Sequence, residues 1–113
     1  MTRLEGEIPI DEVLSDLGAS FRIIHGTLIK MKSHRYKLFK EKGCQCVSCG
    51  VVGSHFYAER SIGTERYHLN LYTSDDILMT KDHIVPKSKG GKNIQSNYQP
   101  MCSPCNQLKD NKL

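Results

Sequence analysis

The alternation of hydrophobic and polar residues along the chain predicts several short strands. The segment 67–73 shows it best, because Tyr67, Leu69 and Leu71 alternate with polar residues, as in a strand that buries one face. A later strand-like segment ends at Pro86, which cannot continue a strand ladder. The predicted strands cover, in chain order, residues 55–60, 67–73, 77–85 and 98–101.

Helical spacing marks three other segments. A short helix is expected to begin with Asp11 as its N-cap and to stop at Gly18, and a final helix is expected to start at Asn106. The helix over 31–42 is the best defined, since its apolar residues form one stripe and Gly43 follows at the position of a left-handed stop. This mixture of strands and helices predicts a small α+β fold.

Two segments have weaker patterns. Residues 21–29 are rich in strand-forming residues but interrupted by Gly26, so they form either a strand or an arm. Residues 87–96 contain Gly90 and Gly91 and show no apolar period, so they are predicted to form a loop.

Composition and charge narrow the class of protein. The 113 residues are 38% hydrophobic and 25% charged, which fits one soluble domain with a thin core that a metal would help to stabilise. No apolar run approaches a membrane span, and the N-terminus lacks a signal pattern, so we expect an intracellular protein without a membrane partner. Residues 1–20 carry a net charge of −4 and residues 21–113 a net charge of +8. The basic body suits a polyanionic partner, although many basic proteins have none.

Two Cys-x-x-Cys pairs are the strongest chemical signal in the sequence. Cys46 and Cys49 form the first pair, Cys102 and Cys105 the second, and 52 residues separate them. Four thiolates make the closed tetrahedral site that is typical of structural Zn²⁺, and an odd cysteine count without a signal peptide argues against a disulfide framework. Cys44 is expected to pack as a small apolar residue. Two alternatives remain open. Cys44 could replace Cys46 as a metal ligand, or the two pairs could be buried or redox-active thiols that bind no metal.

The segment between the two pairs carries a second candidate site. Asp82 and His83 are adjacent at the end of a predicted strand, and Asn106 lies in the first turn of the final helix, beside a cysteine. Carboxylate and amide oxygens are hard ligands that suit Mg²⁺ or Mn²⁺. A neutral imidazole can take a proton from water near neutral pH. Together these residues predict a single-metal hydrolytic site for a phosphodiester.

The run DHIVPKSKGG, then Asn97, then CSPCNQLK, closely resembles the HNH nucleases, over about residues 44–112. The resemblance implies a ββα-metal core with a zinc-knuckle clamp, an inserted β-hairpin and N-terminal helices. It implies that His83 is the general base, that Asp82 and Asn106 bind the catalytic metal, and that Asn97 braces the loop and orients the base. Asn106 stands where the family name has a histidine, as in its HNN members, which biases the metal toward Mg²⁺ or Mn²⁺.

The resemblance further implies a metal-dependent DNA endonuclease that leaves 5′-phosphate and 3′-hydroxyl ends. It divides the chain into an N-terminal helical and basic arm, residues 1–43, and an HNH nuclease domain, residues 44–113. Small proteins of this kind are common in phages, which implies a cytoplasmic location in a bacterial host. Double-stranded DNA is the expected partner, with a homodimer or a phage packaging or replication protein as a further one. Nicking and double-strand cleavage both remain open, as do roles in homing, packaging and restriction.

Lysines around the candidate site are expected to contact DNA phosphates without reading sequence. They are Lys81, Lys87, Lys89, Lys92, Lys109 and Lys112. The helix over 31–42 adds further basic residues, and the resemblance implies that the final helix docks at the minor groove. The histidines without a partner motif are expected at the surface or in a sheet: His25, His34, His55 and His68.

Two other functions compete with the nuclease. A non-catalytic zinc module would bind DNA or protein without cleavage, and the intact set of Asp82, His83 and Asn106 speaks against it. A redox protein would use the Cys-x-x-Cys pairs, and the absence of a βαβ pattern around them speaks against it.

Overall fold

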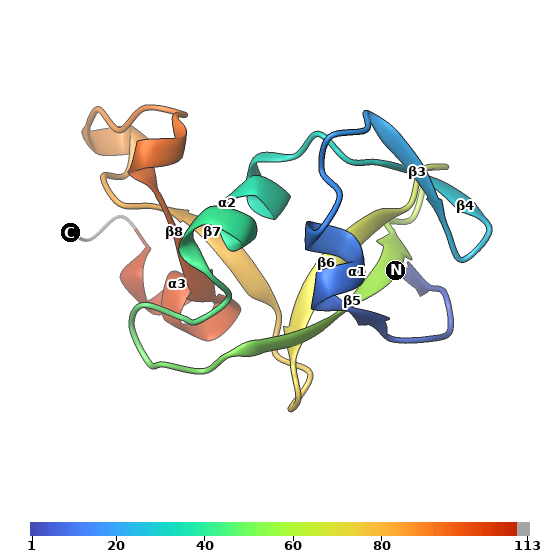
Figure 1. Cartoon of the computed structure of the whole chain (residues 1–113). Coiled ribbons are helices and arrows are strands. Elements are labelled where there is room, and N and C mark those ends of the chain that lie inside the picture. Colours follow the sequence, from blue (N-terminus) through green and yellow to red (C-terminus); the bar gives the residue numbers. More distant parts are fainter. Residues whose placement is uncertain (111–113) are drawn as a thin grey trace.

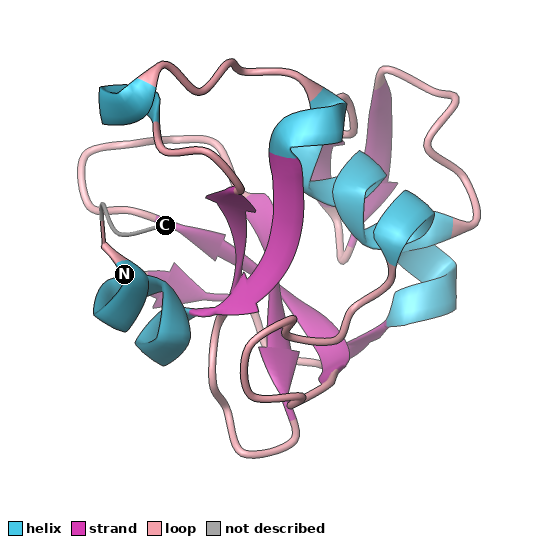
Figure 2. Cartoon of the chain, turned by 90° about the vertical axis from the view of Figure 1, so that its left-hand side faces the viewer, coloured by secondary structure: helices cyan, strands magenta, loops and turns pink. Residues whose placement is uncertain are grey.

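The computed structural model describes residues 1–110, whose course is drawn in Figure 1. The strands are β1 (Thr2–Arg3), β2 (Ile8–Pro9), β3 (Phe21–Ile24), β4 (Thr27–Lys30), β5 (Gly53–Arg60), β6 (His68–Thr73), β7 (Met79–His83) and β8 (Tyr98–Cys102). The helices are α1 (Ile10–Leu14), α2 (His34–Lys42) and α3 (Ser103–Lys109), with 3-10 turns η1 (Lys87–Lys89) and η2 (Gln95–Asn97). Strands lie in the middle with helices on both sides (Figure 2), which confirms the predicted α+β class. No helix within residues 1–110 is long and apolar enough to cross a membrane.

The largest sheet is built around β5. This strand pairs antiparallel with β6 along one edge and with β1 and β2 along the other. The β5–β6 hairpin confirms the predicted strands at 55–60 and 67–73 to within two residues. The first residue of β5, Gly53, lies so close to Leu71 that a Cβ there would be 2.6 Å from the Leu71 side chain, so this position favours glycine. The short strands β1 and β2 were not predicted.

A second strand pair carries the C-terminal part of the chain. β7 and β8 are antiparallel, with Asp82 opposite Gln99 and His83 opposite Tyr98, and α3 follows β8 directly. The strands confirm the predicted ones, but α3 begins at Ser103, three residues before the expected start. Pro104 explains the difference, because proline is favoured in the first turn of a helix, where its missing N–H has no partner to lose.

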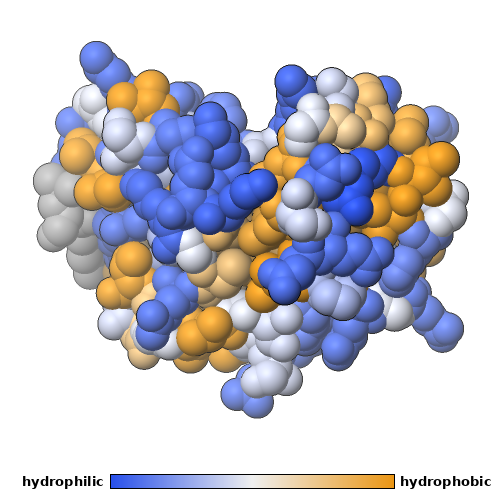
Figure 3. All heavy atoms as spheres, in the orientation of Figure 1, coloured by the Kyte–Doolittle hydropathy of each residue, from blue (hydrophilic) through white to orange (hydrophobic). Residues whose placement is uncertain are grey.

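The N-terminal segment folds against the large sheet. Residues 21–29, expected as a strand or an arm, form the β3–β4 hairpin, whose turn has positive φ at His25 and Gly26. Its outer side exposes Phe21, Ile23 and Leu28, which contribute to the hydrophobic area at the right of Figure 3. α1 begins at Ile10 rather than after Asp11, and it ends at Leu14, before Gly18 is reached.

Helix α2 connects the two strand systems. It begins at His34, three residues after the predicted start, because the Ser33 side chain accepts a hydrogen bond from the Arg35 N–H and caps the helix there. It ends at Lys42, and Gly43 follows with φ 88°, which confirms the predicted end. The buried Tyr36 hydroxyl accepts a hydrogen bond from the backbone N–H of Leu69, 2.8 Å away, which fixes α2 on β6. Residues on both sides of position 43 share one hydrophobic core and one sheet. The division of the chain at residue 43 stays a prediction.

A polar cluster is buried between β5 and β6. The Glu59 carboxylate, only 1% exposed, accepts hydrogen bonds from Arg3 at 2.8 Å, Asn70 at 2.7 Å and Tyr72 at 2.6 Å. Burial alone would raise the pKa of Glu59, but these hydrogen bonds and the charge of Arg3 lower the pKa overall. The second face of β6, expected to be polar and exposed, is therefore buried around this carboxylate.

The Glu59→Gln variant should be less stable than the wild type by about 2 kcal/mol at pH 7, because it leaves Arg3 without its charged partner. Since the folded-state pKa of Glu59 lies below the ordinary value of 4.5, the carboxylate stabilises the fold above that pH. This stabilisation is lost as the pH falls through the lower, folded-state pKa. Urea unfolding of both proteins over a pH series measures the difference in their free energies of unfolding. Protonation of the groups that both proteins share cancels in this difference. A difference that does not shrink on acidification would contradict the prediction.

Candidate active site and metal centre

The two cysteine pairs come together in space. The Sγ atoms of Cys46, Cys49, Cys102 and Cys105 all lie within 4.8 Å of one another, and those of Cys49 and Cys102 are 3.7 Å apart. The sulfurs of a tetrahedral site with Zn–S bonds of about 2.3 Å lie about 3.8 Å apart, so the cluster can hold a metal ion such as zinc. The set contains Cys46 and not Cys44, which packs against the core.

The backbone around Cys46 favours its thiolate. Burial would raise the pKa of the Cys46 thiol, but hydrogen bonds from the backbone of Cys49, Cys102 and Ser48 lower it to about 6. Cys44 has no such donors, and burial raises the pKa of its thiol. Metal ligands must be deprotonated, so the lowered pKa of Cys46 suits coordination, whereas burial raises the pKa of Cys102 to about 12 although Cys102 belongs to the cluster. The positions of the sulfur atoms, rather than these pKa values, therefore separate Cys44 from the ligand set.

The predicted hydrolytic residues line one pocket. Asp82 and His83 end β7, and Asn106 comes from the first half of α3, which packs against β7. The pocket has a volume of about 280 Å³, and its other lining residues are Lys81, Pro86, Lys87 and Asp110. The fold therefore brings together three residues that the sequence places up to 24 positions apart.

Asp82 and Asn106 are each held by neighbours on one side. The buried Asp82 accepts hydrogen bonds from Gln99 at 2.9 Å and from Lys109 at 2.8 Å, and both end on Oδ2. The Asn106 amide nitrogen donates to the Thr80 hydroxyl at 2.8 Å. Neither Asp82 Oδ1 nor the Asn106 amide oxygen takes part in these bonds, so each residue keeps an oxygen that suits a hard cation.

His83 is fixed at one ring nitrogen and one ring face. Its Nε2 lies 2.7 Å from Asn93 Oδ1, and its ring meets the Tyr98 ring edge-on with centroids 5.1 Å apart. Because Asn93 Oδ1 can only accept, Nε2 carries the proton and Nδ1 is left as the basic nitrogen. Asn93 and Tyr98 were not predicted as site residues. The pairing of strands opposite His83 could have identified Tyr98, whereas no spacing signal marks Asn93.

Asn97 braces the loop after β7. Its Oδ1 accepts from the Val85 N–H at 2.9 Å, and its Nδ2 donates to the carbonyls of Val85 at 3.1 Å and Lys92 at 2.9 Å. These bonds tie the start of the loop to its later part. Both roles that the resemblance implies for Asn97, to brace the loop and to orient His83, stay predictions.

The Gly91→Ala variant should destabilise this loop strongly. A Cβ on Gly91 would lie 1.7 Å from the Val85 carbonyl oxygen, so the backbone must move, at a cost of about 1–3 kcal/mol. Gly90→Ala is the matched control: its positive φ of 89° disfavours a side chain, but no atom lies within 4 Å, so it should cost about 1 kcal/mol. Thermal unfolding of both variants measures the difference. Equal losses at the two positions would argue against the close approach.

The lysines predicted to contact DNA are not equivalent. Lys87, Lys89 and Lys92 are exposed. Lys109, with a side chain 16% exposed, turns inward and donates to Asp82, to the His83 carbonyl at 2.5 Å and to the Ile84 carbonyl at 3.4 Å. The DNA contact expected of Lys109 stays a prediction, but its ammonium is engaged in fixing Asp82. Lys112 lies outside the described residues.

Lys81 lies between the pocket and the core. Its ammonium is 4.2 Å from the centre of the Tyr98 ring. Burial lowers the pKa of Lys81, and the positive charges of Arg35 and Lys87 lower it further. Lys81 and Lys87 therefore bring positive charge to a pocket that Asp82 and Asp110 also line, and ammonium groups can bind phosphate oxygens.

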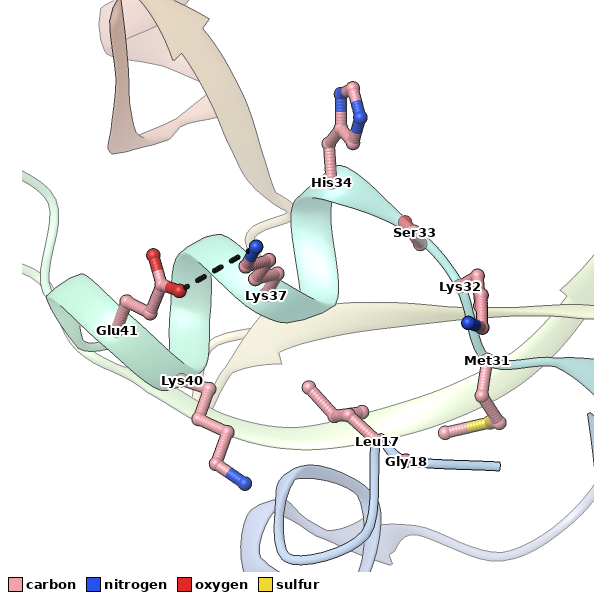
Figure 4. Close-up of a pocket in the computed structure, with 9 residues that line it drawn as sticks. All are labelled: Leu17, Gly18, Met31, Lys32, Ser33, His34, Lys37, Lys40 and Glu41. Atoms are coloured by element: carbon pink, nitrogen blue, oxygen red, sulfur yellow. Dashed lines mark ion pairs between the residues drawn. The ribbon is translucent and has the colours of Figure 1, made fainter. Parts of the chain in front are cut away.

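A larger cavity than the candidate active site lies elsewhere. It measures about 810 Å³ and runs between Leu17–Gly18 and the exposed side of α2, where Lys37, Lys40 and Glu41 line it (Figure 4). None of the residues predicted for catalysis reaches this groove. The chemistry of the lining, rather than its volume, therefore identifies the candidate active site.

Comparison with known families gives a match of residues 72–113 to the HNH endonuclease family. The match contains Asp82, His83, Asn97 and Asn106 together with the second cysteine pair, and it begins later than the resemblance seen in the sequence. No curated protein and no solved structure matches the chain. The family match confirms the resemblance over residues 72–113, and the cysteine cluster is compatible with zinc binding.

Proposed function

We propose that this protein is a metal-dependent endonuclease that hydrolyses phosphodiester bonds of double-stranded DNA. The observation that carries the proposal is the convergence of Asp82, His83 and Asn106 on one pocket, within the segment that matches the family. A basic histidine nitrogen, two free oxygen ligands and two lysines at the pocket are groups that phosphodiester hydrolysis uses. The pair β7–β8 followed by α3 supports assignment of these elements to a ββα-metal core.

Asp82 and Asn106 would hold Mg²⁺ or Mn²⁺ through the oxygens left free by Lys109 and Thr80. Such an ion supplies positive charge that offsets the charge developing on the scissile phosphate. Gln99 and Lys109 keep the Asp82 carboxylate in one orientation, so little rearrangement is needed when a ligand arrives.

His83 acts as the general base. Its Nδ1 takes a proton from water, the resulting hydroxide attacks phosphorus, and the bond from phosphorus to the 3′ oxygen breaks. The Asn93 amide oxygen accepts from Nε2–H and so stabilises the imidazolium that forms. The products are a 5′-phosphate and a 3′-hydroxyl, which takes its proton from solvent.

The four-cysteine cluster binds a structural Zn²⁺ ion in this proposal. It joins the loop after α2 to the start of α3, and Cys105 lies next to Asn106. The closed set of four thiolates leaves no position for substrate, so the zinc holds Asn106 in place and takes no part in the reaction.

A supercoiled-plasmid assay tests the proposal. Zinc-loaded protein should nick or linearise the plasmid with added Mg²⁺ or Mn²⁺ and not without them. Residues 1–110 carry one such pocket, so a monomer should give open circles. A homodimer or a phage packaging or replication partner would permit linear products. DNA binding without cleavage under every metal condition would instead support a non-catalytic zinc module. A cytoplasmic location in a bacterial host and a phage origin remain part of the proposal.

A further inference from the structure

A second basic pocket lies beside the start of α2, outside the candidate active site. It has a volume of about 260 Å³ and is formed by the end of β4, the start of α2 and the start of β6. Five side chains that carry or can carry positive charge line it: Lys30, Lys32, Arg35, Arg66 and His68. No carboxylate is among its lining residues within the described part of the chain.

Arg35 is held in place before any ligand arrives. Its guanidinium donates to Asn70 Oδ1 at 2.7 Å and to the Leu69 carbonyl at 3.2 Å, both on β6. Tyr36 anchors the same turn of α2 to Leu69. The pocket thus combines one immobilised guanidinium, on α2, with the exposed side chains of Lys30, at the end of β4, and Arg66, in the loop before β6.

The pocket is connected to the active site through Tyr98. His34, between two residues that line the basic pocket, has its Nδ1 3.2 Å from the Tyr98 hydroxyl. The ring of the same buried tyrosine meets His83 and Lys81. Tyr98 therefore contacts both the turn of α2 beside the basic pocket and two residues that line the candidate active site.

We propose that the pocket formed by Lys30, Lys32, Arg35, Arg66 and His68 binds a backbone phosphate of the duplex DNA, away from the scissile bond. The inference rests on the proposed function for the nature of its ligand. Guanidinium and ammonium groups bind phosphate oxygens through charge-assisted hydrogen bonds, and an arginine can do so with two parallel bonds. The contact fixes the duplex on the protein without reading its sequence.

The test compares two double variants of the full-length, zinc-loaded protein, each also carrying His83→Ala so that the DNA stays intact. Lys30→Ala/Arg66→Ala removes two exposed charges from the basic pocket. Lys37→Ala/Lys40→Ala removes two exposed charges of α2 that line the larger groove instead (Figure 4). Binding of a fluorescent duplex is measured from 50 to 300 mM salt, and unfolding curves confirm that both variants are folded.

The pocket variant should raise Kd about tenfold at 100 mM salt and lower the slope of log Kd against log salt by about 2, since each phosphate contact contributes about 0.9. The groove variant should change Kd less than about twofold. Equal weakening by both variants, or no change in the pocket variant, overturns the inference.

The plasmid assay separates this outcome from the proposed function. If the wild type cleaves the plasmid and the pocket variant binds the duplex with an unchanged Kd, the phosphate site is rejected and the proposed nuclease function stands. Absence of cleavage together with weakened binding in the pocket variant rejects the nuclease and keeps the DNA contact.

Discussion

Replacing His83 with alanine should lower the rate of metal-dependent DNA cleavage about a thousandfold, in the range that loss of a general base produces. In the structure Nε2 of His83 is hydrogen-bonded to Asn93, so Nδ1 is the ring nitrogen that is left to accept a proton. The ring lines the pocket beside Asp82. No other imidazole lines this pocket within residues 1–110, so no neighbour can replace the base. Single-turnover cleavage of a labelled duplex, with protein in excess, measures the chemical step apart from product release.

DNA binding is the control for this variant. The imidazole is partly exposed, and its removal leaves no buried charge, so the affinity for a duplex should stay within about twofold of the wild type. Asn93→Ala is the matched partial variant: it removes the acceptor for Nε2–H and leaves the base, so a loss of about tenfold and an altered pH profile are expected. Cleavage by His83→Ala at the wild-type rate would refute the assignment of the base.

Loss of a metal from the four-cysteine cluster should unfold the whole molecule, whose two strand systems share one hydrophobic core. Cys102 is both the last residue of β8 and the N-cap of α3, and the cluster it belongs to holds these elements against the Cys46–Cys49 turn. Structural zinc in small domains contributes about 10–16 kcal/mol of binding free energy, which is as large as the whole stability of a typical domain. Chelation of zinc, or Cys102→Ser, should therefore abolish the cooperative unfolding transition seen by circular dichroism.

Cys44→Ser provides the matched control for the zinc prediction. It changes a cysteine two residues before the first ligand that lies outside the cluster. This variant should keep one zinc per chain, measured by elemental analysis, and should lose no more than about 1 kcal/mol of stability. Loss of zinc from Cys44→Ser, or its retention by Cys102→Ser, would mean that the ligand set is wrong.

The elements nearest the site were predictable because their signals are local. The strands at 55–60 and 67–73, the helix stop at Gly43 and the two cysteine pairs follow from spacing over a few residues. The strands β1 and β2 were not predictable, since each has two residues and is defined only by the edge of β5 that it pairs with. Tertiary packing also buries the face of β6 that was expected to be exposed. Asn70 is buried there because Glu59 accepts a hydrogen bond from it.

The candidate site shows the same division. Asp82, His83 and Asn106 could be chosen from residue chemistry and resemblance, and the structure places them in one pocket. The contacts that orient them could not be predicted. Lys109 reads as an exposed helix lysine, and only the packing of α3 on β7 turns it toward Asp82. Asn93 lies in a loop without periodic pattern, and the close approach of Gly91 to Val85 constrains the path of that loop.

The distance along the chain between the two cysteine pairs has a consequence for how the protein folds. A metal bound by all four thiolates acts as a cross-link that closes a loop of more than 52 residues, including all of β5, β6 and β7. A cross-link of this span lowers the conformational entropy of the unfolded chain by an amount equivalent to about 4 kcal/mol. An ion captured first by the Cys46–Cys49 turn must wait for β8 to arrive before its coordination is complete. We therefore expect metal capture to be biphasic, with a slow second phase whose rate reports the closure of this loop.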